Sequence, residues 1–195
     1  MSESNKDLRG DLEILEAMAS EMDQYLQSQA LFWPMMNGGL PRLTIGGYLM
    51  RQHRLTSLRD QLDANDKVRL EAAVGQFNEA LVEKIVRFEE RAHQEIHARL
   101  RQWGEYLKEL HDSKLGIGDY YISHVQTRLM ITSLIHKLEE QPYELDSRVF
   151  EQLAVYDNIL RNYWVPGSFI WADEWKPAYP EAEYWWLYGQ PRSDR

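Results

Sequence analysis

The feature that most constrains the fold is an uninterrupted helical pattern between residues 66 and 112. This segment contains no proline, and its apolar side chains recur at steps of three and four residues from Phe77 to Leu110. Such steps place side chains on one face of an α-helix. A straight helix of this length would span about 70 Å. Since most globular helices are far shorter, we expect a bend or break near Gly75 or Gly104.

Helical periodicity also covers most of the remaining chain, in segments 6–30, 47–62, 119–140 and 146–163. Segment 119–140 is apolar around most of its circumference, which is typical of a central helix. We therefore expect His136 to be a hydrogen-bonded core residue. No strand-and-helix alternation and no hairpin pattern stands out. The sequence predicts an all-α fold, a helical bundle of four to five long helices.

Local signals suggest how these helices begin and which faces they expose. Asn65 or Asp66 is a plausible N-cap for the long helical segment, because short polar side chains accept hydrogen bonds from the first helical N–H groups. Glu95 precedes Arg99 by four residues, the favoured order for an ion pair on an exposed helix face. This spacing predicts a solvent-facing side for the segment that contains both residues.

Two irregular, aromatic-rich segments accompany the helices. The connector 31–55 holds two glycine pairs and two prolines, and the C-terminal tail 164–195 holds four prolines and five of the seven tryptophans. We expect residues 1–163 to form the bundle and residues 164–195 to pack on it as an extension of the same domain. Apolar side chains on irregular backbone favour burial, so both segments are expected to cover an end or groove of the bundle.

The leading functional hypothesis is binding, through an apolar-aromatic pocket or partner surface made by residues 32–54 and the tail. Its expected aromatic walls are Trp33, Trp164, Trp171, Trp175, Trp185 and Trp186, and its expected polar groups are Arg42, Arg51 and His53. Aromatic faces with nearby carboxylates suit an organic cation or a basic peptide. Tryptophans also anchor protein partners. The structural alternative is a tail that covers helix surface with large rings.

A metalloprotein, with or without enzymatic activity, is the first alternative. His93 and His97 lie one helical turn apart, so both imidazoles could bind one divalent metal. The third ligand would have to come from His53, His124 or His136. The order of residues does not match the zinc-protease pattern, because the glutamate between the histidines is displaced by one position. The simpler interpretation of the two histidines is a solvated helix face.

Composition and sequence features limit the remaining classes of function and partner. A net charge of −9 argues against nucleic acid as a general partner. The chain has no cysteine, which excludes disulfides and thiolate ligands. It shows no signal peptide and no apolar run of transmembrane length, so we expect a cytoplasmic protein without a membrane partner. Apart from the metal alternative, no cofactor is expected. A structural homo-oligomer, such as a homodimer, is the second alternative, since the same apolar surface could form its interface.

Overall fold

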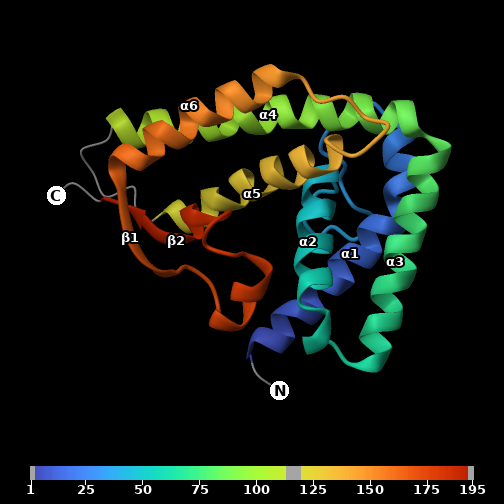
Figure 1. Ribbon diagram of the computed structural model, residues 1–195. Helices are drawn as coiled ribbons and strands as arrows, with labels where there is room; N and C mark the ends of the chain where they lie inside the picture. The colour runs from blue at the N-terminus through green and yellow to red at the C-terminus, as the bar shows by residue number, and fades with distance from the viewer. Residues whose placement is uncertain (1–2, 113–119, 193–195) are drawn as a thin grey trace. The chain divides into compact units, whose positions relative to one another are not determined.

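The structure, a computed structural model, describes residues 3–112 and 120–192. It is mostly helical, which confirms the predicted fold class (Figure 1). The chain forms two compact units, Met1–Glu95 and Ile96–Arg195. Helix α4 (Ile85–Asp112) begins in the first unit and ends in the second.

The first unit is built around α1 (Glu3–Gln27), which packs against α2 (Ile45–Ser57) and α3 (Ala64–Glu83) (Figure 1). A short 3-10 helix, η1 (Arg59–Gln61), precedes α3. The apolar periodicity of α1 selects its buried face correctly. Fully buried residues on this face are Leu8, Leu12, Leu15, Met18, Met22 and Leu26.

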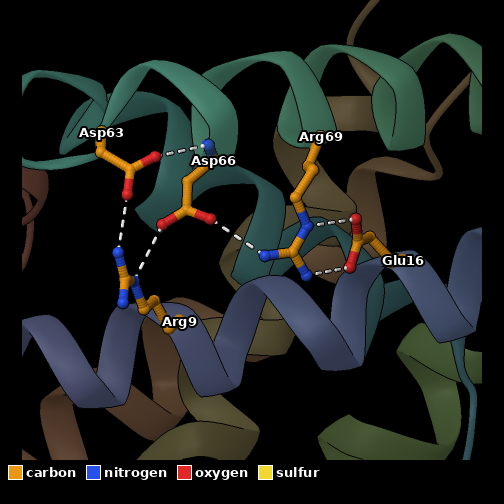
Figure 2. A network of polar contacts seen from close by, with 5 residues as sticks. All are labelled: Arg9, Glu16, Asp63, Asp66 and Arg69. Carbon is orange, nitrogen blue, oxygen red and sulfur yellow. Dashed lines mark hydrogen bonds and ion pairs between the residues drawn. The ribbon is translucent and has the colours of Figure 1, made fainter.

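A polar network joins α1 to the start of α3 (Figure 2). The N-cap of α3 is Asp63, whose carboxylate accepts a 2.8 Å hydrogen bond from the N–H of Asp66. The expected caps, Asn65 and Asp66, lie inside the helix instead. Asp63 also forms a 2.6 Å ion pair with Arg9. The cap therefore fixes the helix start and holds it to α1 at the same time.

Asp66 is the buried centre of this network, with 3 % of its surface exposed. Arg9 donates to one carboxylate oxygen at 3.0 Å and Arg69 donates to the other at 2.9 Å. Arg69 in turn forms a bidentate ion pair with Glu16 of α1, with hydrogen bonds of 2.9 and 2.6 Å (Figure 2). A buried carboxylate needs such paired donors to offset the loss of water.

The long helical segment breaks at Lys84, so the expected break near Gly75 or Gly104 is wrong. Lys84 has φ −129° and ψ 38°, and α3 ends and α4 begins on either side of it. Its ammonium group forms an ion pair with Asp23 of α1. This tertiary contact, together with the local backbone geometry, sets the break at a residue of good helix propensity. Gly75 lies inside α3 with open space beside it.

The connector between α1 and α2 is a loop closed at its base. Trp33 and Leu43 exchange backbone hydrogen bonds of 3.0 and 2.9 Å. Glu21 of α1, with 7 % of its surface exposed, accepts from the indole N–H of Trp33 at 2.8 Å and from the backbone N–H of Met36 at 3.1 Å. Met36 is nevertheless 86 % exposed. The carboxylate therefore holds an irregular segment against a regular helix.

The second unit contains the latter part of α4, α5 (Tyr121–Leu138) and α6 (Ser147–Tyr163). Helix α6 lies beside α4 (Figure 1). Gly104 of α4 allows this close approach, because a Cβ atom there would lie 2.5 Å from the hydroxyl of Tyr156. Gly104 is thus a packing position, and α4 continues through it.

The tail contains a small antiparallel sheet that the sequence pattern did not predict. Strand β1 (Trp164–Phe169) pairs with β2 (Tyr188–Pro191), with a register shift between Pro166 and Phe169. Gly189 has φ 143°, and a Cβ atom there would collide with the carbonyl oxygen of Val165. Irregular pairing that depends on glycine conformation shows no clear alternation in sequence. Two 3-10 helices, η3 (Asp173–Ala178) and η4 (Trp185–Leu187), lie between the strands in sequence.

Candidate functional site

The aromatic side chains of the C-terminal tail form one continuous cluster. Ring centroids lie 5.3 Å apart for Trp164 and Trp185, 6.0 Å for Trp185 and Trp186, and 5.9 Å for Trp171 and Trp175. Tyr179 and Tyr184 connect the two ends of the cluster. Distances of this size favour aromatic pairs. The five predicted tail tryptophans are therefore brought together in the second unit.

Two arginines cover the faces of the last two tryptophans. The guanidinium carbon of Arg128 lies 3.8 Å from the ring centroid of Trp186, and that of Arg161 lies 3.9 Å from the ring centroid of Trp185. Both distances are well within the range of cation–π attraction. The tail thus presents its rings to cations supplied by α5 and α6.

The two arginines differ in how firmly they are held. Arg128 is buried, with 3 % of its surface exposed. It donates to both oxygens of Asp157 at 3.1 and 3.0 Å and to the hydroxyl of Thr132 at 2.6 Å. Arg161 is exposed near the end of α6, and within the described part of the chain its side chain makes no hydrogen bond or ion pair.

A groove of about 430 Å³ lies where α5, α6 and the tail meet. Its apolar lining includes Ile135, Phe150, Leu153, Trp185 and Trp186. Phe150 is 42 % exposed, which is unusual for a phenylalanine. An apolar groove with a few polar groups at its edge has the character of a ligand site.

The polar lining of this groove is more acidic than basic. Arg128 and Arg161 face three carboxylates, Asp157, Glu139 and Glu183, so the lining has a net charge of −1 when His136 is neutral. Burial, followed by the nearby charge of Glu183, raises the pKa of Tyr184, whose ring packs on Trp186. The Tyr184 phenol is therefore uncharged at neutral pH.

His136 stands at the rim of this groove and is not the core residue that its helix suggested. Its side chain is 46 % exposed, and its Nε2 lies 3.3 Å from a carboxylate oxygen of Glu183. Although α5 is apolar around much of its circumference, this position faces the polar part of the tail.

The sequence predicted Trp185 and Trp186 of this groove but none of its charged residues. Arg128 lies in the most apolar helix, and a charged residue in such a helix requires a buried partner. That signal could have singled out Arg128, but nothing local identifies Asp157 as its partner. Arg161 follows Asp157 by four residues, a spacing typical of ordinary helix surfaces.

Two of the predicted site residues of the first unit, Trp33 and Arg51, have structural partners there. Trp33 is bound by Glu21, as described above. Arg51 forms a 3.3 Å ion pair with Asp11 and donates to the carbonyl oxygen of Gly47 at 2.9 Å. His53 is half-buried on α2, and Arg42 is exposed in the connector. Because these residues and the tail belong to different units, a pocket shared by the connector and the tail stays a prediction.

The two histidines of the metal hypothesis are both on α4, where His93 is half-buried and His97 is exposed. Among the described residues, no group of three or more histidine, aspartate and glutamate side chains is arranged to hold a metal ion. Of the proposed third ligands, His124 stacks on Tyr106 with ring centroids 4.5 Å apart. The metal alternative therefore lacks support from the described part of the chain.

Glu95, between these histidines, is fully buried, so the exposed helix face predicted at this position is wrong. Its carboxylate accepts a 3.0 Å hydrogen bond from the backbone N–H of Gly46, in the first turn of α2. A carboxylate at this position complements the N-terminal end of the helix dipole. Glu95 therefore has a structural contact that helix periodicity alone could not predict.

A second groove, of about 470 Å³, lies between α4 and α6. Leu107 and Ile159 contribute apolar surface, and His111 Nδ1 lies 2.6 Å from the hydroxyl of Tyr163. It contains none of the predicted binding residues.

No helix in the described ranges combines the length and the apolar character needed to span a bilayer. Comparison of the chain with protein-family models, curated proteins and solved structures found no match.

Proposed function

We propose that this protein is a binding protein whose ligand site is the groove lined by Trp185, Trp186 and Phe150. The observation that carries the proposal is the composition of this groove. The half-buried indole of Trp185 and the partly exposed ring of Phe150 stand beside charged groups on α5 and α6, and Trp186, which is only 3 % exposed, completes the lining. A ligand would bury its apolar part against the rings and orient its polar part toward the charges.

The arginine contacts support this assignment because they make the groove rigid on one side. Arg128 is fixed by Asp157 and Thr132 and in turn packs on Trp186. A preorganised wall lowers the entropic cost of binding. Phe150 and Arg161, by contrast, are exposed lining residues of the same groove.

The test is a screen of small organic compounds by ligand-observed NMR, followed by two matched variants on α6. Phe150→Ser removes the partly exposed ring from the groove without changing its charge. Val155→Ser truncates an apolar side chain on the same helix at a residue that is 56 % exposed and does not line this groove. We expect binders that are weakened with Phe150→Ser and retained with Val155→Ser. Absence of binders, or equal loss in both variants, would contradict the proposal.

A homo-oligomer is the second candidate function. Val82 and Val86, at the junction of α3 and α4, are 79 % and 64 % exposed. Neighbouring exposed apolar side chains are common in protein interfaces. Sedimentation equilibrium of Val82→Lys beside the unmodified protein tests this candidate. A dimer that the substitution converts to monomer supports it, and a monomer at all concentrations contradicts it.

A further inference from the structure

The structure itself places a guanidinium group on the face of Trp185. This group belongs to Arg161, whose side chain is exposed and, within the described residues, is held only by its stacking on the ring. Arg128, by contrast, is buried and donates hydrogen bonds to Asp157 and Thr132. Of the two cations in the groove, Arg161 is therefore the one that a competitor could displace.

Charge decides which kind of ligand would compete. When Arg161 swings away into solvent, Arg128 remains with three carboxylates, Asp157, Glu139 and Glu183, and the lining has a net charge of −2 with neutral His136. An incoming cation restores the balance, whereas an anion meets a surplus of negative charge. The net charge of the whole chain, −9, likewise favours a cation over an anion.

We infer that the groove takes an organic cation of the guanidinium class, which replaces Arg161 on the face of Trp185. The inference rests on the proposed function, because it names the ligand class for the same groove. The alkyl part of the ligand would lie along Phe150 and Leu153, and a volume of about 430 Å³ accommodates a small alkylguanidine. Arg161 then acts as a built-in competitor that lowers the affinity.

The experiment is a titration with agmatine, an alkylguanidine, at constant ionic strength, with binding followed by calorimetry and by the indole N–H signals. Arg161→Ala removes the competitor and uncovers the ring. We expect agmatine to bind this variant about 2- to 5-fold more tightly than the unmodified protein, the factor that a cation–π contact at an exposed site implies. Putrescine, which lacks the guanidinium group, is expected to bind more weakly than agmatine.

Two further variants separate stacking from general charge. Arg148→Ala removes one positive charge from the same helix, at an exposed residue paired with Asp146, and is expected to leave agmatine affinity unchanged. Glu183→Gln removes one carboxylate of the groove and is expected to weaken binding. Absence of agmatine binding to both the unmodified protein and Arg161→Ala would overturn the inference, as would Arg161→Ala binding no more tightly than Arg148→Ala. If neutral compounds still bind in the groove, the proposed function survives and only the ligand class is wrong.

Discussion

Replacement of Arg128 by methionine tests the contact that shapes the groove. The substitution removes the bidentate ion pair with Asp157, the hydrogen bond to Thr132 and the stacking on Trp186. Breaking a buried ion pair costs about 3–5 kcal/mol. Because the Asp157 side chain is 22 % exposed, water can partly solvate the remaining carboxylate. We therefore expect a loss of about 2–4 kcal/mol in the free energy of unfolding of the second unit.

Urea unfolding followed by tryptophan fluorescence reports mainly on the second unit, in which the substitution lies. Trp33 is in the first unit, and the other six of the seven tryptophans are in the second. Adding Asp157→Asn to the variant removes the uncompensated charge and should recover about 1 kcal/mol or more. Arg148→Ala, which breaks an exposed pair with Asp146, is the control and should have a much smaller effect, because water screens exposed ion pairs. An effect of Arg128→Met as small as that of the control would refute the reasoning.

Three further predictions concern other parts of the chain. Asp66→Asn should lower the free energy of unfolding of the first unit by about 1–2 kcal/mol, a modest loss because the two arginine partners are partly exposed to water; the ¹⁹F signal of Trp33 in protein labelled with 5-fluorotryptophan reports it. Gly104→Ala should lower the free energy of unfolding by about 1–3 kcal/mol, because the new methyl group collides with the phenol of Tyr156. Gly75→Ala, with open space around it, should raise the free energy of unfolding by about 0.5–1 kcal/mol. Thermal unfolding compares the two variants. Arg148 and the helix N–H groups lower the pKa of Asp146 to about 2, so the stabilisation from this N-cap is present above pH 4 and is lost as the pH falls toward 2; carboxyl NMR titration should show the pKa rising in Arg148→Ala, and an unchanged value contradicts the assignment.

Helix faces could be predicted from the sequence because burial repeats every three to four residues. The six periodic leucine and methionine residues of α1 named above are all fully buried, and the predicted all-α class is confirmed. The break at Lys84 could not be predicted in this way, because it depends on a contact with Asp23, which is distant in sequence. The cap of α3 is Asp63 and not Asn65 or Asp66, because several neighbouring residues share the polar character of a cap and the sequence pattern alone does not choose among them.

In the candidate site too, local sequence features could be predicted and contacts between distant residues could not. The tail tryptophans were identified by their density in the sequence, and their rings do pack together. The cations that cover them come from two helices, and no local pattern pairs Arg128 with Trp186 or Arg161 with Trp185. Glu95 and His136 were each assigned to the wrong environment, because helix periodicity describes a face but not what packs against it.

The most direct test of the central claim is a ¹⁹F NMR titration of protein labelled with 5-fluorotryptophan, with signals assigned by single Trp→Phe substitutions. Agmatine and the compounds selected by the screen would be added in turn. Binding in the groove predicts that the signals of Trp185 and Trp186 shift with ligand concentration while that of Trp33 stays in place. Ligand-dependent shifts at Trp33 with Trp185 and Trp186 unmoved, or no shift at any tryptophan, would contradict a ligand site in this groove.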